Sequence, residues 1–402
     1  MTVPTPRFPW WLRSIDAIGD AGRRCGLMRG MLDAPAMLAA AAAAEGHEQF
    51  GEGTRAMLEV LVGSLKQDAR LAFHGRVHLH AMLMTSLRVR LRLEAARQRD
   101  PSIDRPPTRP PLIVCGLPRS GTTLLHRLLA LADDARPLLL WELMEPIAGP
   151  GPDLRREQAD QKLHRLQAFL PVSLDAQHYI RGDLPDEDGH LFKPSLVSSL
   201  QYQAPALSWL DRMLRDDLEI GYRNWRALLA LLEAPGRRFV LKDPFHARRI
   251  GLISSLVPEA MIVRTHRDPA QVVPSFHKLT MTMHAVTCTA LDVPAIVAAN
   301  TRWIESITDA CLAPLGGSQG RVIDVDYRAI VRDPVAVARA IHAQFGLAWS
   351  DDLEARMRRF VADNGQRKHG DNRYDPDAFG QPAAALRERF ADYRRTFGLD
   401  VG

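Results

Sequence analysis

Cysteine patterns typical of disulfide frameworks or metal sites are lacking from this 402-residue sequence. Its four cysteines, at positions 25, 115, 288 and 311, form no CxxC pair and no regular spacing. Cys115 falls within an apolar run, where a thiol behaves as a small hydrophobic side chain. Thiols distributed in this way are typical of a reducing compartment, so we expect a cytoplasmic protein.

Segments for export or membrane insertion are lacking as well. The N-terminus, MTVPTPRFPWWLRSIDAIGD, has neither the continuous apolar core nor the small-residue cleavage site of a signal peptide. The run AMLAAAAAAEG at 36–46 is too short and too rich in alanine to span a bilayer. We therefore expect no membrane span.

Neither charge nor histidine spacing indicates a nucleic-acid or metal site. The formal net charge is +5, and a balance of this size does not select a partner. His74, His78 and His80 include a pair four residues apart, but no HExxH glutamate and no third ligand accompany them. Arginines alternate with apolar residues over 87–99, a pattern typical of a solvated helix packed on one side. We expect no metal and no nucleic acid.

The sequence does have 46% apolar residues, which is ample for a sizeable core. Residues from about 12 to 100 keep apolar side chains three to four positions apart, as helices do. A proline-rich stretch at 100–111 ends this pattern, and short apolar runs then alternate with helical segments. Strands are expected at 112–116, 138–142, 238–242, 260–266 and 321–327. The alternation predicts an α/β domain over 106–402, with helices flanking a mainly parallel sheet, behind an N-terminal helical region at 1–105.

The stretch GLPRSGTT, at 116–123, has the glycine frame of a phosphate-binding loop but lacks its lysine. Its glycines would let the chain turn tightly, and the start of the following helix would offer N–H groups to an anion. In a loop for nucleoside triphosphates, lysine and then serine or threonine follow the second glycine. Thr122 and Thr123 stand there instead, and Arg119 supplies a positive charge earlier. The loop therefore suits a 5′-phosphate group of an adenosine-type donor better than magnesium-bound ATP.

These residues resemble the 5′-phosphosulfate loop of sulfotransferases that use 3′-phosphoadenosine 5′-phosphosulfate (PAPS). GLPRSGTTLLHRLLA is similar to the bacterial branch of that family, in which PRSGTT or PRTGTT is common. The resemblance implies a P-loop-like sulfotransferase core with PAPS as the sulfuryl donor and no metal. It also implies which residues hold the 5′-phosphosulfate, namely Arg119, Ser120, Gly121, Thr122 and Thr123.

The segment MIVRTHRDPAQVVPSF, at 261–276, supplies a candidate second anion site. Arg267 would end a strand, Asp268 and Pro269 would begin a helix, and Ser275 would lie about two turns into it. An arginine beside a serine at a helix start can bind a phosphate through paired hydrogen bonds. Sulfotransferases have an arginine and a serine at the same spacing, which implies that Arg267 and Ser275 bind the 3′-phosphate of PAPS.

Three further segments resemble elements of the same family. RFVLKDPFH is similar to its LKSPEH element, with Asp243 where serine is more usual, and Lys242 would offset charge on the departing phosphate. GRVIDVDYRAIV would place Tyr327 near the adenine, and GQRKHG would place Arg367 and Lys368 around the 3′-phosphate. A solvated strand-end lysine, a core tyrosine and a solvated charge run are the respective alternatives.

Sulfuryl transfer to a hydroxyl also needs a base, which is typically worth about 10²–10⁴ in rate. Glu142, in PLLLWELMEP, would end the strand after the loop helix, where bacterial and tyrosyl-protein sulfotransferases place a glutamate. His246 follows the strand of Lys242, where cytosolic relatives use a histidine, although it could also cap a turn. We favour Glu142, with Glu145 as a lesser neighbour.

The acidic stretch LPDEDGHLF resembles the segment before the helix that covers the acceptor cleft. Asp186, Glu187 and His190 either line that cleft or are exposed residues at a helix start. The resemblance as a whole covers about 45–395 and predicts a PAPS-dependent sulfotransferase, acting on the hydroxyl or amine of a small-molecule, lipid or carbohydrate acceptor. A P-loop kinase or NTPase and a non-catalytic binding protein on the same scaffold are the rival interpretations. The sequence does not separate the acceptor classes, and it indicates no oligomeric state.

Overall fold

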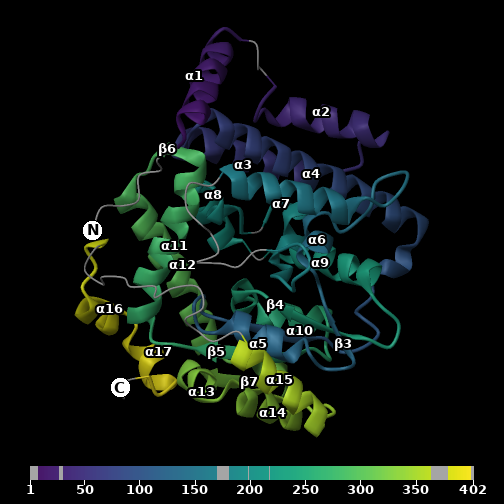
Figure 1. Cartoon of the computed structure of the whole chain (residues 1–402), viewed down its shortest axis with the longest axis vertical. Helices are drawn as coiled ribbons and strands as arrows, with labels where there is room; N and C mark the ends of the chain where they lie inside the picture. Colours follow the sequence, from purple (N-terminus) through teal and green to yellow (C-terminus); the bar gives the residue numbers. More distant parts are fainter. Residues whose placement is uncertain are drawn as a thin grey trace.

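The computed structural model describes residues 8–26, 30–169, 181–197, 199–216, 218–363 and 379–399. Helices from the N-terminal part of the chain form a layer at one end of the molecule, and a five-stranded sheet lies toward the other end (Figure 1). None of the helices in these ranges combines the length and apolarity needed to span a bilayer.

Most of the N-terminal region is helical, as the apolar spacing predicts. Its helices are α1 (Trp10–Arg24), α2 (Ala34–Glu45), α3 (Thr54–Asp68) and α4 (Phe73–Arg99). The Asp33 side chain accepts a hydrogen bond from the first turn of α2, and Gly46 ends that helix in the left-handed conformation, with φ 77°. Along α4, the side chains of Leu83, Leu87 and Leu91 are fully buried, which fixes the orientation of this long helix against the rest of the molecule.

Helices α2, α3 and α4 share a large hydrophobic core with the remainder of the chain. A continuous cluster of buried side chains extends from Leu32 to Leu399. Arg92 of α4 adds a polar link, since it forms ion pairs with Glu45 at 2.8 Å and with Glu145 at 2.6 Å. The division at residue 105 stays a prediction, but the two parts pack as neighbours throughout.

The central sheet is parallel throughout, which confirms the predicted α/β class. Its strands, in spatial order, are β3 (Ala135–Pro137), β4 (Arg238–Lys242), β2 (Leu112–Gly116), β5 (Met261–His266) and β7 (Val322–Asp326). Ile113 of β2 lies opposite Leu241 of β4 and Ile262 of β5, so the carboxyl ends of the three strands reach the same edge. In open parallel sheets, ligands bind at that edge.

The prediction of a strand at 138–142 is wrong. The strand β3 ends at Pro137, and residues Leu140–Met144 form the short helix α6. The backbone N–H of Leu139 donates to the Glu142 carboxylate at 2.9 Å, so a helix-start contact replaces strand pairing here. Two strands that the sequence pattern did not indicate, β1 (Arg70–Leu71) and β6 (Cys288–Ala290), pair antiparallel outside the main sheet.

Alternate residues of each strand face different helical layers. Leu112 and Val114 pack with Leu125 in a smaller core, whereas Ile113 and Cys115 belong to the large core that reaches the N-terminal helices. The helices around the smaller core are α5 (Thr122–Leu129), α13 (Tyr327–Arg332), α14 (Pro334–Gln344) and α15 (Asp351–Asp363). The sheet is therefore covered on both faces, as a parallel sheet requires.

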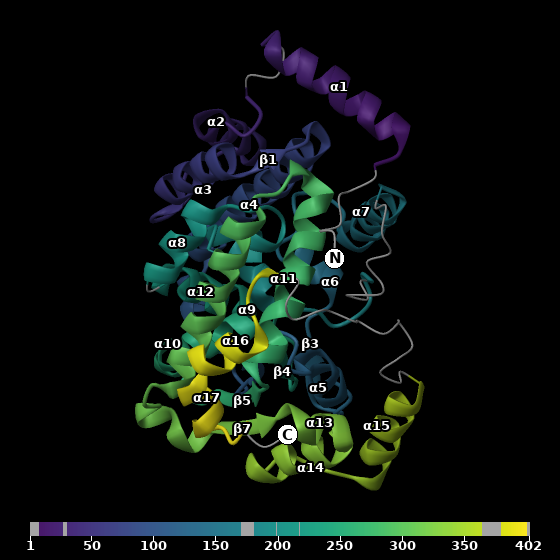
Figure 2. The ribbon, with the colours of Figure 1, turned by 90° about the vertical axis from the view of Figure 1, so that its left-hand side faces the viewer.

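The other face of the sheet carries the larger helical layer. Its helices and those at the rim are α7 (Arg155–Phe169), α8 (Leu207–Arg215), α9 (Glu219–Leu232), α10 (Ile250–Leu256), α11 (Pro269–Thr287), α12 (Val293–Leu312), α16 (Ala383–Arg389) and α17 (Ala391–Thr396). Short 3₁₀ helices connect them: η1 (Pro101–Asp104), η3 (Asp188–Ser195), η4 (Ser199–Tyr202), η5 (Pro244–Arg248) and η6 (Gly316–Arg321). The last two helices pack against α11 and α12 (Figure 2).

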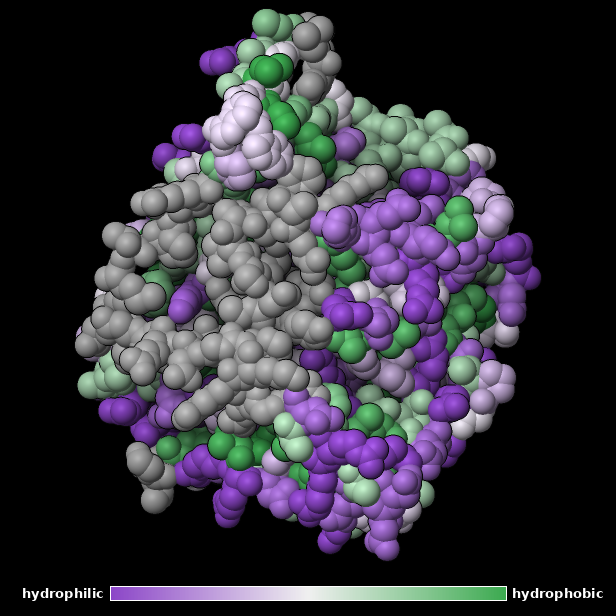
Figure 3. All heavy atoms as spheres, in the orientation of Figure 1, coloured by the Kyte–Doolittle hydropathy of each residue, from purple (hydrophilic) through white to green (hydrophobic). Residues whose placement is uncertain are grey.

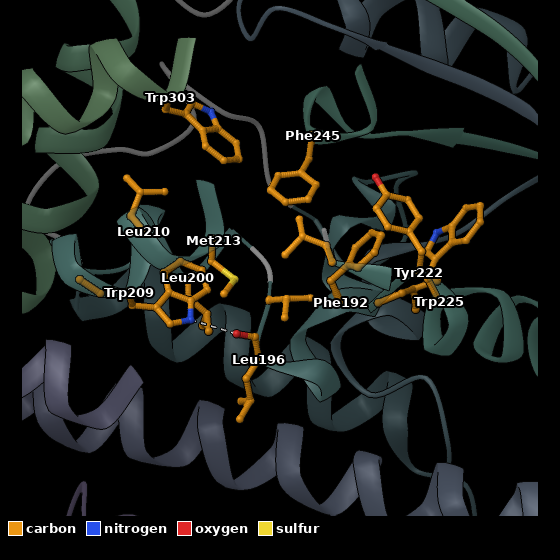
Figure 4. Packing of buried hydrophobic residues seen from close by; sticks show 14 of the residues in the cluster. Phe192, Leu196, Leu200, Trp209, Leu210, Met213, Tyr222, Trp225, Phe245 and Trp303 are labelled. Carbon is orange, nitrogen blue, oxygen red and sulfur yellow. Dashed lines mark hydrogen bonds between the residues drawn. The ribbon is translucent and has the colours of Figure 1, made fainter. Parts of the chain in front are cut away.

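Aromatic side chains dominate the centre of the large core. Phe192 of η3 lies among Tyr222, Trp225 and Phe245, with ring centroids 4.8 to 6.3 Å apart (Figure 4). Trp209 lies in the same region and donates from Nε1 to a backbone carbonyl of the segment after η3, at 3.1 Å. This packing fixes η3 beneath the carboxyl edge of the sheet.

Candidate active site

The phosphate-type loop lies between β2 and α5, at the carboxyl edge of the sheet. Gly116 has a φ of 127°, and a Cβ atom there would lie 2.2 Å from the carbonyl oxygen of Thr265 on β5. Arg119 and Gly121 also take positive φ angles, of 65° and 85°. Three residues with positive φ within six positions turn the chain sharply into α5. The first N–H groups of this helix lack partners within the helix.

Hydroxyl groups hold this loop to the neighbouring strand. The side chain of Ser120 is fully buried, and its Oγ lies 2.6 Å from Oγ1 of Thr265 and also donates to the carbonyl of Leu117. Thr122 is buried at the first position of α5, and Thr123 is half-buried beside it. Ser120 therefore fixes the shape of the loop, and the two threonines lie where the helix start would meet an anion.

Four residues predicted to bind the donor meet beside this loop, although they come from separate segments. Nε of Arg119 donates to Oγ of Ser275 on α11 at 3.3 Å. Nη1 of Arg267 donates to the backbone carbonyl of Arg119 at 2.6 Å. The Arg267 guanidinium also lies 4.3 Å from the centre of the Tyr327 ring, and a Cβ atom on Gly121 would lie 3.2 Å from that ring.

This cluster places two arginines, a serine hydroxyl and an aromatic face around one end of the loop. The sequence explains the local geometry at α11, because the Asp268 side chain accepts from the N–H of Ala270 at 3.0 Å and Pro269 occupies the first turn. The helix start then carries Arg267 just before it and Ser275 within it. Two cations at such a place favour a ligand with more than one negative charge.

Lys242 lies on the other side of the loop, at the carboxyl end of β4. Its side chain is only 1% exposed, and Nζ donates to Oε1 of Glu187 at 2.6 Å. Glu187 is 25% exposed, so this ion pair has a buried lysine and an accessible carboxylate. From the sequence, Glu187 was predicted only to line an acceptor cleft. No residue near Glu187 or near Lys242 indicated that the two side chains would pair.

Glu142 occupies a different kind of position. Both of its oxygens are engaged by Arg136, at 2.6 and 3.0 Å, and one also accepts the N–H of Leu139. The carboxylate is 8% exposed and stabilises the start of α6. Glu145, its neighbour, pairs with Arg92 of α4. The spacing that suggested Glu142 gave no indication of Arg136 as its partner.

His246 is fully buried, and both of its ring nitrogens have partners. Nε2 lies 2.9 Å from Oδ2 of Asp188, and Nδ1 lies 3.1 Å from the hydroxyl of Tyr222. Asp188 also accepts a hydrogen bond from Nε1 of Trp225 at 2.7 Å. Burial alone would lower the pKa of His246, but the charge and hydrogen bond of Asp188 outweigh it and raise that pKa. The arrangement is that of a buried ion pair that anchors η3 to η5.

Asp243, next to Lys242, is the most perturbed carboxyl of this region. Burial, with the negative charge of Glu187 as the next cause, raises the pKa of Asp243 to about 7. One of its oxygens accepts the N–H of Phe245 at 2.7 Å, and the other lies so close to Gly189 that a Cβ atom there would be 1.7 Å away. The carboxyl is thus buried where the negative charge of Glu187 acts on it.

Two predicted residues, Arg367 and Lys368, lie outside the described residues. Within the described ranges, His, Cys, Asp and Glu side chains nowhere gather in a group of three that could hold a metal ion. Of the N-terminal histidines, His74 binds Asp16 at 2.8 Å and a backbone carbonyl of α11 instead.

The chain is similar to proteins of a known family over more than half of its length. The model of the sulfotransferase family matches residues 110–351, which include the loop, Lys242, Arg267, Ser275 and Tyr327. Among curated relatives, the omega-hydroxy-beta-dihydromenaquinone-9 sulfotransferase Stf3 of Mycobacterium bovis, and the protein of the same name from Mycobacterium tuberculosis, are each 23% identical over 276 residues. The match covers 64% of this chain and 68% of each relative.

Solved structures extend the likeness to nearly the whole chain. Sulfotransferase STF1 of Mycobacterium tuberculosis superposes with a TM-score of 0.73 at 26% identity, over 89% of this chain and 97% of its own. Sulfotransferase STF9 of Mycobacterium avium superposes with a TM-score of 0.79 at 25% identity, over 91% of this chain and 96% of its own. The shared region includes helices that precede the matched family segment, because coverage of this size extends beyond residues 110–351.

Proposed function

The chain belongs to the sulfotransferase family and is an enzyme, and from that premise we propose that it transfers a sulfuryl group from PAPS to a hydroxyl group of a lipid-like acceptor. The observation that carries the proposal is the meeting of Arg119, Arg267, Ser275 and Tyr327 beside a loop without the lysine of a triphosphate site. Family membership also favours this interpretation over a kinase or NTPase.

Donor binding would use both parts of this cluster. We assign the 5′-phosphosulfate to the N–H groups at the start of α5 together with Thr122 and Thr123. We assign the 3′-phosphate to Arg267 and Ser275, because a guanidinium that donates two hydrogen bonds and a neighbouring hydroxyl suit a phosphate group. Arg119 links the two subsites, because its guanidinium reaches Ser275 while its carbonyl is held by Arg267.

The remaining donor contacts follow from the same arrangement. The Tyr327 ring, in contact with the Arg267 guanidinium, would support the adenine, since an aromatic face next to a cation suits a flat heterocycle. Arg367 and Lys368 remain the predicted additional cations around the 3′-phosphate. Ser120 and Gly121 would contribute by setting the curvature of the loop rather than by charge.

The chemical step needs a carboxylate to accept the proton of the acceptor hydroxyl and a cation to stabilise the leaving group. The acceptor hydroxyl loses its proton to a carboxylate as its oxygen bonds to sulfur, and the bond between sulfur and the bridging phosphate oxygen breaks with its electron pair on that oxygen. We assign to Lys242, whose side chain is buried at the strand end, the role of offsetting the charge that develops there. Positioning and charge supply the rest of the catalysis, as in phosphoryl transfer.

For the base we propose Glu187 in preference to the predicted Glu142. Glu187 is accessible and lies 2.6 Å from Lys242, so a proton acceptor and a cation stand side by side at the reacting edge. Glu142 would have to give up two contacts with Arg136 to act as a base, and His246 has both nitrogens engaged in the core. A base must reach the proton that it removes before its basicity matters.

A lipid alcohol is the proposed acceptor class. It rests on the relatives named as sulfotransferases of omega-hydroxy-beta-dihydromenaquinone-9, an acceptor with a long apolar chain and a terminal hydroxyl. Transfer of labelled sulfate from PAPS to isoprenoid alcohols, compared with simple phenols and sugars, tests this class. Transfer to sugars alone would contradict it. A reducing compartment remains part of the proposal, since all four cysteines are free.

The donor assignment has a direct test. We expect 3′-phosphoadenosine 5′-phosphate to raise the melting temperature well above the effect of 5′-AMP, because binding at about 100 times the Kd adds about 2.7 kcal/mol. In the Arg267→Ala variant this difference between the two nucleotides should disappear, while the weak effect of 5′-AMP remains. Arg226→Ala, on α9, is the matched control. Equal stabilisation by both nucleotides in the parent protein would contradict the 3′-phosphate site, and donor binding without transfer to any acceptor would favour a binding protein.

A further inference from the structure

The N-terminal helix α1 docks on the body through one face only. Its Leu12 is 3% exposed, and Gly19 packs so closely on the Phe73 ring that a Cβ atom would lie 2.3 Å away. Asp16 accepts hydrogen bonds from the backbone N–H and Nδ1 of His74, at 2.9 and 2.8 Å. These contacts fix which side of the helix is turned outward.

The outward side of α1 carries large apolar side chains. At about 100° per residue, Trp10, Ser14, Ile15, Ala17, Ile18 and Ala21 share this side, which we term the outer face of α1. Trp10 and Ile18 are each 73% exposed, and Ile15 is 45% exposed. Figure 3 shows apolar surface on this projecting part of the molecule. Apolar side chains of this size normally pack against something.

Basic side chains border the outer face of α1. Arg13 and Arg24 are both exposed and follow one edge of it, with the half-buried Asp20 next to them, whereas Asp16 is held by His74 on the inner side. A helix with tryptophan and isoleucine on one side and arginines along its edge matches the pattern of helices that lie in the plane of a membrane surface. The arginines would attract anionic headgroups.

The position of α1 suits that role. The helix stands out from the rest of the chain, and it projects on the side of the molecule on which α6 and α7 lie (Figure 2). α6 packs against η3, which directly follows Glu187. A lipid alcohol is retained in a bilayer by its apolar chain, so an enzyme acting on it gains by staying at the surface. This step rests on the proposed lipid acceptor.

We propose that the outer face of α1 binds the surface of a membrane that contains anionic lipids. Trp10, Ile15 and Ile18 would insert at the level of the headgroups, and Arg13 and Arg24 would contact the headgroup phosphates. The helix lies along the surface and does not cross it, since it is a single amphipathic segment of 15 residues.

Co-sedimentation with vesicles tests the proposal on the full chain, without donor or acceptor. We expect binding to phosphatidylcholine vesicles that contain phosphatidylglycerol and much weaker binding to phosphatidylcholine alone. The double variant Trp10→Ala/Ile18→Ala should bind the anionic vesicles at least about tenfold more weakly. Arg13→Gln/Arg24→Gln should reduce the preference for anionic vesicles. The control Leu154→Ala/Leu231→Ala removes exposed apolar side chains elsewhere and should bind as the parent does.

Unchanged circular dichroism and unchanged turnover of a water-soluble alcohol would show that the α1 variants remain folded. Vesicle binding that is equal in the parent and in Trp10→Ala/Ile18→Ala would overturn the proposal. A sedimentation coefficient that rises with concentration, and stops rising in that variant, would overturn it in favour of a second copy of the chain. Loss of sulfuryl transfer with vesicle binding intact would count against the proposed function alone.

Discussion

Replacing Asp243 with asparagine should remove a pH dependence of stability. Burial and the charge of Glu187 raise the pKa of Asp243 from 3.8 to about 7 in the folded protein. A carboxyl with a raised pKa binds its proton more tightly when folded, so the stabilisation is complete below pH 4 and is lost as pH rises through about 7. Asparagine keeps the shape and the hydrogen bond from the N–H of Phe245 but cannot ionise.

The size of the effect follows from the pKa. Between pH 5 and the folded pKa of about 7 lie two pH units, and each is worth about 1.4 kcal/mol, so the parent should lose about 3 kcal/mol from pH 5 to pH 8 through this group. The Asp243→Asn variant should therefore gain stability over the parent at pH 8 relative to pH 5.

Urea unfolding followed by tryptophan fluorescence at the two pH values measures this difference. The matched control is Asp351→Asn, at the exposed start of α15, which should keep the pH dependence of the parent. If Asp243→Asn and the parent lose the same free energy of unfolding between pH 5 and pH 8, then Asp243 does not titrate near neutrality and the packing argument fails.

Four other substitutions separate catalysis from structure. Glu187→Gln should lower kcat by about 10²–10⁴ with donor binding unchanged, whereas Glu142→Gln should lower the melting temperature more than kcat; the reverse pattern in steady-state kinetics would restore Glu142 as the base. Asp188→Ala should destabilise by about 3–5 kcal/mol in urea unfolding, because it leaves the buried His246 cation unpaired, and a change below 1 kcal/mol would refute the ion pair. Gly116→Ala should weaken binding of 3′-phosphoadenosine 5′-phosphate in calorimetry, because its Cβ would collide with β5 and displace the loop; parent-like affinity would contradict this.

Short-range signals accounted for the parts of the fold and site that local chemistry determines. The glycine frame after an apolar run indicated the turn from β2 into α5, and Asp268 with Pro269 indicated the start of α11. Because Arg267 and Ser275 lie on this one helix start, their nearness could be predicted from spacing. Their meeting with Arg119 followed from the parallel sheet, which brings the ends of β2 and β5 to one edge.

Contacts between distant segments could not be predicted in the same way. Lys242 and Glu187 are separated by 55 positions, and nothing near either residue indicates the other. His246 was predicted to act as a base or to cap a turn, and neither interpretation indicated its buried partner Asp188, which is 58 positions away. Glu142 was assigned to a strand because four consecutive apolar residues precede it. In the structure its carboxylate accepts hydrogen bonds from Arg136 and from the backbone N–H of Leu139, and a helix begins there instead.

The single core that joins the N-terminal helices to the sheet limits how the enzyme can be divided. The proline-rich stretch after α4 looks like a point for separation, and the matched family segment begins at the end of this stretch. A chain cut there would expose the buried leucine stripe of α4 against which η3 packs, and it would free Glu145 from Arg92. Since η3 follows directly on Glu187, removing the helices would disturb the proposed base, so we expect sulfuryl transfer to require the helical layer.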